Sequence, residues 1–217
     1  MAKSGPRKQA VPNEELRTRL IDAAVCVLAR EGFARTSARA VAQEAGTVNG
    51  SIFYYFGSMD GLLAATANAL ADRGIARIHE GLGGAKAHVE WRGRLSTVLR
   101  DEAHGADGHA VMELFVGART SPALAAEVRK AIDRAVDYAT SELDLVLGSS
   151  PITQLIPVSL IAELAAATIL GIEVFQQNGR DIDLEHVASV LDEGIRLIGG
   201  SSGSGVTQAS SSIPSPG

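Results

Sequence analysis

The sequence is poor in cysteine and in aromatic residues. Cys26 is the single cysteine among 217 residues, so an intramolecular disulfide and a thiolate metal cluster are excluded and a reducing, cytoplasmic location is expected. Aromatic residues make up 4% of the chain and hydrophobic residues 46%. Because Ala and Leu recur in almost every segment, helices packed by small and aliphatic side chains are favoured over a β-sheet. The composition therefore predicts an all-α fold.

Long uninterrupted hydrophobic runs are also missing. Behind the basic N-terminal residues, a proline and three polar residues at 12–15 (PNEE) interrupt any apolar stretch of the signal-peptide type. The most apolar stretch, 155–175, contains Pro157, Glu163 and Glu173. Because two carboxylates at that depth would be costly in lipid, we interpret this stretch as a helix buried at a protein interface and expect no membrane partner.

Motifs of catalysis are absent from the sequence as well. There is no GxxxxGK phosphate loop, no HExxH zinc motif and no strand-linked GxGxxG or GxSxG turn. Acidic and histidine residues do gather between 101 and 113, at Asp101, Glu102, His104, Asp107, His109 and Glu113. A metal site is one interpretation of this cluster, and a solvated acidic loop is the one we favour. We therefore predict a protein that is not an enzyme and needs no cofactor or metal.

The net charge of −5 is distributed unevenly. Residues 1–59 contain eight Lys or Arg and five Asp or Glu, a net charge of +3, so the rest of the chain carries −8. A mildly basic head on an acidic body is typical of a protein that contacts phosphate groups with one end only.

Capping residues and glycines divide the chain into predicted helices. Asn13 is a favourable N-cap, and Gly32, Gly46 and Gly57 are favourable helix ends. The predicted helices span about 13–31, 37–45, 49–55, 58–82, 88–103, 108–119, 122–147, 153–177 and 184–198. Outside them, residues 1–12 are expected to form a flexible basic arm and residues 199–217 a disordered Gly/Ser/Pro-rich tail.

The second and third predicted helices form a helix-turn-helix. Thr36 or Ser37 caps the first of them, and Gly46 supplies the turn. Two short helices around such a turn, braced by a longer helix before them, are typical of a DNA-binding head whose second short helix enters the major groove. We therefore place a three-helix DNA-binding domain at 13–59 and a helical body at 60–198.

Residue types at the turn suit contacts with DNA. Gly50 and Ser51 lie at the start of a helix, where backbone N–H groups and the positive helix end attract a phosphate. Asn49 can pair with adenine, and the forked guanidinium of Arg39 can reach a guanine edge or a phosphate. A solvated surface arginine is the alternative for Arg39.

Aromatic residues are concentrated in the third predicted helix. Phe53, Tyr54 and Tyr55 are consecutive, and on so short a helix they cannot all be part of a core. Ile52 and Phe56 are four residues apart, which is the spacing of a buried face, and we expect both in the core.

Residues 36–63 (TSARAVAQEAGTVNGSIFYYFGSMDGLL) resemble the DNA-binding signature of the TetR family, and residues 20–33 (LIDAAVCVLAREGF) resemble its first helix. The chain departs from the signature at Met59, where the family usually has lysine, and at Thr47 and Val48, where it usually has valine and serine. Phe53 replaces a tyrosine and so lacks its hydroxyl. The resemblance implies a TetR-like fold with DNA contacts from Thr36, Ser37, Arg39, Asn49, Gly50, Ser51, Phe53, Tyr54 and Tyr55.

The resemblance also implies a ligand-responsive regulator, acting as a repressor, that binds an inverted-repeat operator in double-stranded DNA as a homodimer. Apolar faces on the helices at 153–177 and 184–198 support dimerisation. These faces contain Leu155, Ile156, Leu160, Ile161, Leu164, Ile169 and Ile172, and Val187, Val190, Leu191, Ile195 and Leu197. The alternative to a DNA-binding protein is a helical adaptor that binds only protein.

The resemblance implies a ligand pocket inside the body. Because the segments with the candidate residues carry few charges, the expected effector is a small hydrophobic or amphipathic molecule. Candidate residues for this site are the large or polar-tipped side chains at helical positions, most of which would serve equally well in a core. They are Trp91, Met112, Phe115, Arg119, Tyr138 and Phe175.

Overall fold

A computed structural model describes residues 13–82, 105–148 and 151–180, together with single positions and pairs between 182 and 193. Within these ranges the chain consists of α-helices with two short 3-10 turns and no strand, which confirms the predicted all-α class. The predicted arm, the predicted helix at 88–103 with Trp91, and the predicted tail lie outside the described residues. Of the predicted helix at 184–198, positions 186–187, 189–190 and 193 are described and are helical.

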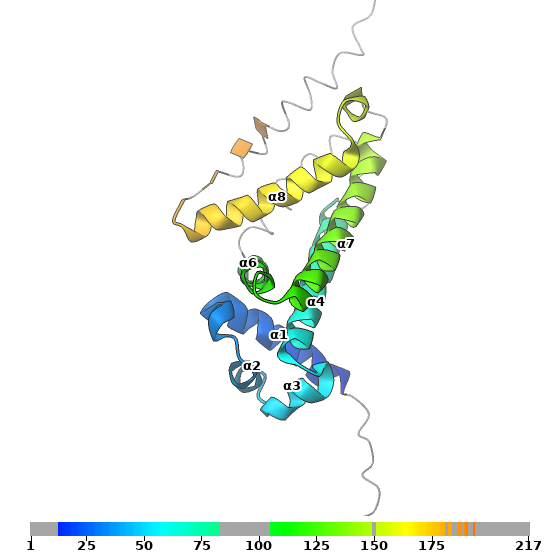
Figure 1. The fold of residues 1–217 in the computed structure, drawn as a ribbon. Helices are drawn as coiled ribbons and strands as arrows, with labels where there is room; N and C mark the ends of the chain where they lie inside the picture. The colour runs from blue at the N-terminus through cyan, green and yellow to red at the C-terminus, as the bar shows by residue number, and fades with distance from the viewer. Residues whose placement is uncertain are drawn as a thin grey trace, which may run out of the picture.

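Three helices form the head of the molecule, at the bottom of Figure 1. They are α1 (Glu14–Glu31), α2 (Ala38–Glu44) and α3 (Asn49–Phe56). The Asn13 side chain accepts hydrogen bonds from two backbone N–H groups of the first turn of α1, and Gly32 ends this helix at a φ of 81°. Both boundaries agree with the sequence prediction, because capping is a local interaction that a sequence displays directly.

The helix-turn-helix also forms as predicted. Ser37 is the N-cap of α2, and its Oγ accepts a hydrogen bond from the Ala40 N–H at 3.2 Å. Gly46 in the turn and Gly57 after α3 have φ values of 64° and 74°. Residues with a Cβ rarely adopt this left-handed conformation, so glycine is favoured at both positions.

The described part of the body contains four long helices. They are α4 (Met59–Leu82), α6 (Ala106–Ala118), α7 (Pro122–Leu147) and α8 (Val158–Gln177). In Figure 1, α4 rises from the head beside α7, α6 lies against the head, and α8 runs back from the far end of α7. Through these helices the body packs directly on α1 of the head.

One predicted boundary is wrong. The sequence prediction started the helix of α8 at residue 153, whereas α8 starts at Val158, after a 3-10 turn at Pro151–Gln154. Pro157 precedes the helix with a ψ of 140°. A proline has no N–H for the helical ladder and its ring clashes with the preceding turn, so it is tolerated at a helix start and not four residues inside one.

Two hydrophobic clusters stabilise the head. The first, the head core, lies among α1, α2, α3 and the start of α4, and it is centred on Val41, Ile52 and Leu62, all 0% exposed. Phe56 packs against it while remaining partly exposed. Ile52 is therefore confirmed as a core residue, and it fixes which side of α3 faces inward.

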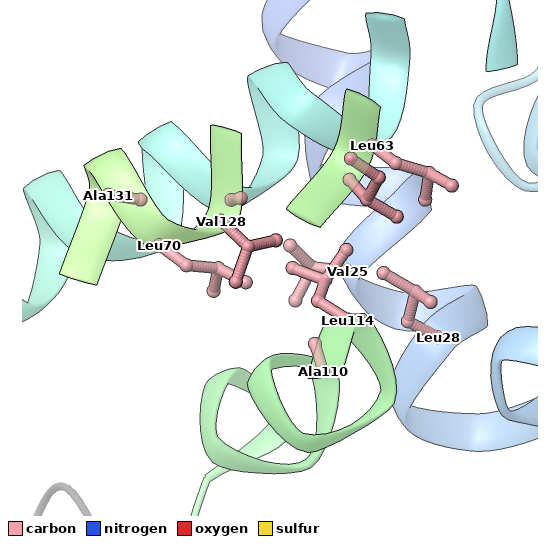
Figure 2. Close-up of a cluster of buried hydrophobic side chains, with 10 residues drawn as sticks. Val25, Leu28, Leu63, Leu70, Ala110, Leu114, Val128 and Ala131 are labelled. Carbon is pink, nitrogen blue, oxygen red and sulfur yellow. The ribbon is translucent and has the colours of Figure 1, made fainter. Parts of the chain in front are cut away.

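The second cluster, the joint core, is shared between the head and the body (Figure 2). Val25 and Leu28 of α1 pack there against side chains of α4, α6 and α7. The other buried members are Leu63, Ala67, Leu70, Ala110, Leu114, Leu124, Val128 and Ala131. Because α1 contributes to both cores, a shift of the body helices is transmitted to the head through direct packing.

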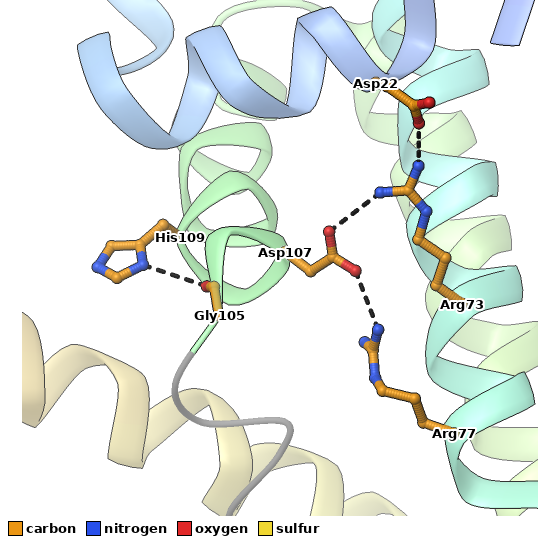
Figure 3. A network of polar contacts seen from close by, with 6 residues as sticks. All are labelled: Asp22, Arg73, Arg77, Gly105, Asp107 and His109. Carbon is orange, nitrogen blue, oxygen red and sulfur yellow. Dashed lines mark hydrogen bonds and ion pairs between the residues drawn. The ribbon is translucent and has the colours of Figure 1, made fainter. Parts of the chain in front are cut away.

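A polar network crosses the same junction (Figure 3). Arg73 of α4 pairs with Asp22 of α1 and, at 3.1 Å, with Asp107 of α6. Arg77 pairs with the second oxygen of Asp107 at 2.9 Å. Each of these side chains is a quarter to a half exposed, so solvent screens the pairs and their main effect is to orient the three helices.

Candidate nucleic-acid interface

The outer face of α3 carries the exposed aromatic side chains of the head. Phe53 is 52% exposed and Tyr54 61% exposed, whereas Ile52 beside them is buried. The Tyr54 ring packs edge-on against Tyr55, with ring centroids 5.0 Å apart. The exposed rings leave the outer face of α3 accessible to the DNA contacts predicted for Phe53 and Tyr54, which stay predictions.

The start of α3 offers fewer free donors than the sequence suggested. Ser51 donates its backbone N–H to the Val48 carbonyl at 3.0 Å, and its hydroxyl lies 3.0 Å from that of Thr47. Asn49 and Gly50 occupy the first two positions of α3 and are exposed. Backbone N–H groups at these positions have no acceptor within the helix. Phosphate contacts from Asn49, Gly50 and Ser51 therefore all stay predictions, and the backbone N–H of Ser51 already has an acceptor in the Val48 carbonyl.

Arg39 of α2 differs from Thr36 and Ser37, which precede the helix. The Thr36 hydroxyl donates to the Gly32 carbonyl at 2.9 Å, and Ser37 is the N-cap. Arg39 is exposed, and no hydrogen bond or ion pair of its side chain is found with the described residues. Its guanidinium therefore extends into solvent, whereas the DNA contacts expected of Thr36 and Ser37 remain predictions for side chains that already have a structural role.

Tyr55 has a structural contact that the sequence did not indicate. Its hydroxyl oxygen accepts a hydrogen bond from the Asn13 N–H at 3.0 Å, which ties α3 to the start of α1. The ring is half-buried and packs against the head core. The hydroxyl proton is still available to a phosphate oxygen, so the predicted DNA contact and the structural contact are compatible.

Replacing Tyr55 with Phe separates these two roles. Loss of the hydroxyl leaves the Asn13 N–H to water, and we expect the free energy of unfolding to fall by about 1 kcal/mol, which is the net contribution of one exposed hydrogen bond. Urea denaturation measures this loss, and operator titration measures any additional phosphate contact. Unchanged stability would contradict the structural contact.

The residues proposed for an effector site do not all come together. Met112 and Phe115 are half-buried on α6, and Phe115 packs against the joint core. Arg119 is exposed at the end of α6. Phe175 on α8 is 48% exposed, with the Arg180 guanidinium 5.5 Å from its ring centroid. The described contacts do not join these four side chains into one site.

Tyr138 of α7 belongs to a hydrogen-bonded chain with α4. Its hydroxyl donates to Glu142 at 2.8 Å and lies 2.7 Å from Nδ1 of His79. Burial, together with the hydrogen bond to the Glu142 carboxylate, raises the pKa of Tyr138 to about 12. The phenol is therefore protonated at neutral pH and donates its hydrogen bond. Tyr138 thus links α7 to α4 rather than to Phe115.

The acidic cluster divides among separate contacts. Asp107 pairs with two arginines, as described above. Glu113 accepts a hydrogen bond from the Phe33 N–H at 2.6 Å, so α6 of the body holds the segment that joins α1 to α2. Residues 101–104 lie outside the described part, and in that part no group of three or more Asp, Glu, His or Cys side chains is arranged to hold a metal ion.

Comparison with known proteins agrees with this geometry. The profile of the tetR family of bacterial regulatory proteins matches residues 20–66, which span α1 to the first turns of α4. An HTH-type transcriptional regulator of Mycobacterium tuberculosis is 30% identical over 118 residues, which are 54% of this chain and 60% of that protein. The matched region therefore covers less than two thirds of the relative's length.

Solved structures share the fold of the whole described chain. A TetR-family regulator from a Rhodococcus species superposes with a TM-score of 0.71 at 24% identity, covering 86% of this chain and all of the other. A transcriptional regulator from Saccharomonospora viridis, solved in complex with choline, gives a TM-score of 0.65 at 19% identity, covering 85% of this chain and 97% of the other. The family model and the Mycobacterium relative are both of transcriptional regulators, which agrees with the prediction that the chain is not an enzyme. The head, residues 20–66, is thus similar to the DNA-binding part of the TetR family of regulators, and the body shares the fold of TetR-family structures.

Proposed function

We propose that the chain is a ligand-responsive repressor that binds a palindromic operator as a homodimer in the cytoplasm. The observation that carries this proposal is the outer face of α3, where Asn49, Gly50, Phe53 and Tyr54 are exposed on a helix whose other side is fixed by Ile52. A helix held in this way can enter the major groove without losing its own packing.

Recognition follows from two-fold symmetry. The two α3 helices of a dimer enter successive major grooves about 34–36 Å apart, or somewhat further if the heads are spread. Phe53 and Tyr54 supply apolar contact to thymine methyl groups or sugars, and Arg39 supplies a base or phosphate contact from α2. A protein-binding adaptor does not require this distance between its α3 helices. Binding to an inverted repeat therefore distinguishes a DNA-binding regulator from an adaptor.

Replacing Arg39 with Ala tests the interface. We expect affinity for the operator, selected from a random DNA library, to fall by about 1–3 kcal/mol if the guanidinium contacts a base. Arg129→Ala is the matched control, because Arg129 is exposed on α7 of the body. Fluorescence anisotropy at fixed salt measures both variants. Equal affinity and equal sequence preference in Arg39→Ala and the wild type would assign Arg39 to the solvated surface.

An uncovered apolar stripe on α8 supports the homodimer. Leu160, Leu164, Val174 and Phe175 are 40–57% exposed, and their spacing places them along one side of the helix. Of the described helices, α8 alone is long and apolar enough to span a membrane by length and composition. Because Glu163 and Glu173 would be costly in lipid, we assign the stripe to a second copy of the chain.

Other residues of the predicted dimer faces belong to the inside of the subunit. Ile172 is 3% exposed, and Ile161 packs against the small cluster of Leu143, Leu147 and Ala162 between α7 and α8. Ile161 is thus partly buried inside the subunit, and an interface contact from Ile161 or from Leu164 stays a prediction.

Ligand control would act through the joint core. The choline complex of the Saccharomonospora protein is a property of that protein, and its fold supports an effector site in the body of this one. An effector shifts the equilibrium only if it binds more tightly to a form whose heads are wrongly spaced. Because α4 and α6 pack directly on α1, a change in the body alters the head position without any loop acting as a hinge.

A further inference from the structure

A buried carboxylate lies in the body without a full set of partners. Glu173 of α8 is 3% exposed, and its Oε2 atom has no hydrogen-bond partner. Glu173 was not among the site residues predicted from the sequence, although a carboxylate in the middle of an apolar helix is a signal that could have selected it.

Both described partners of Glu173 use its other oxygen. Gln177 donates its side-chain N–H to Oε1 at 3.0 Å, and Nδ1 of His109 lies 3.4 Å from the same atom. Nδ1 of His109 also lies 3.2 Å from the Gly105 carbonyl. In Figure 3, His109 and Asp107 leave the first turn of α6 in opposite directions, so the arginines that pair with Asp107 lie on the other side of α6 from His109.

His109 compensates the carboxylate only weakly. Its side chain is 48% exposed, so solvent screens the pair, and 3.4 Å is longer than an ordinary N–H···O hydrogen bond. An ionised carboxylate in a protein interior needs an opposite charge and hydrogen-bond donors on both oxygens. Within the described part of the chain, Oε2 has neither.

We propose that Oε2 of Glu173 is the binding point for the cationic group of the effector. The ligand class is an amphiphile with a primary or secondary ammonium or a guanidinium on an apolar body: its N–H donates to Oε2, and its charge neutralises the carboxylate. This inference rests on the proposed ligand response and narrows the effector class from any amphipathic molecule to a cationic one.

Isothermal titration with n-alkylammonium ions and n-alcohols of matched length, from four to twelve carbons, tests the inference. We expect the wild type to bind an ammonium ion more tightly than the alcohol of the same length, and Glu173→Gln to lose about ten- to hundredfold of the ammonium affinity. The alcohol affinity should not change. Glu163→Gln is the matched control, because Glu163 is exposed on the same helix, and it should behave as the wild type.

The outcomes distinguish this inference from the proposed function. Equal ammonium affinity in Glu173→Gln and the wild type, or absence of ammonium binding at every chain length, would overturn the role of Glu173. Release of operator DNA by an alcohol would still support ligand control in that case. If compounds that bind the body leave operator affinity unchanged, the ligand response itself is contradicted. Thermal unfolding of each variant confirms that the fold is retained, since Gln preserves the shape of Glu.

Discussion

Replacing Leu164 with Lys is expected to convert the proposed homodimer to monomers and to reduce operator affinity by on the order of 10²–10⁴-fold. Leu164 is 57% exposed on the α8 stripe, so the isolated subunit loses little packing when the side chain changes. In a dimer the same position is covered, and a buried ammonium without a partner is costly. The loss on DNA is large because a monomer binds one half-site without the gain in effective concentration that a linked second head provides.

Light scattering at micromolar concentration measures the oligomeric state, and anisotropy measures operator binding. Leu145→Lys is the matched control. Leu145 is 83% exposed on α7, and it lies two residues from both Leu143 and Leu147, whose side chains are buried in the cluster between α7 and α8. We expect this variant to stay dimeric. A Leu164→Lys protein that remains dimeric would refute the α8 interface.

Replacing Gly117 with Leu is expected to lower the free energy of unfolding by about 3 kcal/mol, because it forces the Phe33 ring out of the joint core. A Cβ at Gly117 would overlap this ring, lying 2.7 Å from its Cζ atom. Glycine-to-alanine changes inside a helix usually stabilise it by about 1 kcal/mol. Gly117→Ala should therefore lower the free energy of unfolding instead of raising it, because overpacking costs about 1–3 kcal/mol.

A second substitution tests the cause. Phe33→Ala removes the ring, so Gly117→Leu in that background fills the vacated space and should restore part of the lost stability. Urea denaturation of the four proteins gives the coupling energy between the two positions, expected at about 1–3 kcal/mol. Additive effects in this cycle would show that Gly117 is required for some reason other than contact with Phe33.

Local features of the fold were predictable from the sequence. The predicted spans 13–31 and 122–147 agree with α1 and α7 to within one residue, because Asn13 and Ser121 are N-caps and Gly32 and Gly148 follow the last turns. The helix-turn-helix was predictable for the same reason. Interactions within four residues along the chain decide where a helix begins and ends, and they can be recognised without knowledge of the fold.

Contacts between distant segments were not predictable. Tyr55 reaches Asn13 across 42 residues, and Glu113 reaches the Phe33 N–H across 80. No periodicity or capping pattern specifies such pairs, since they depend on how whole helices pack. The proposed effector residues failed to converge for the same reason: large side chains such as Phe115 and Tyr138 were selected by type, and packing gave them other partners.

The joint core has a consequence for cooperativity. Since α1 shares buried side chains with the head core on one face and with α4, α6 and α7 on another, separating the head from the body would expose Val25 and Leu28 to water. Local opening of the head alone is therefore costly, and amide protons in the middle of α1 should exchange with solvent only when the joint core also opens. Head and body form a single folding unit, so a chimera that grafts this head onto another regulator needs a body whose α4, α6 and α7 match the second face of α1.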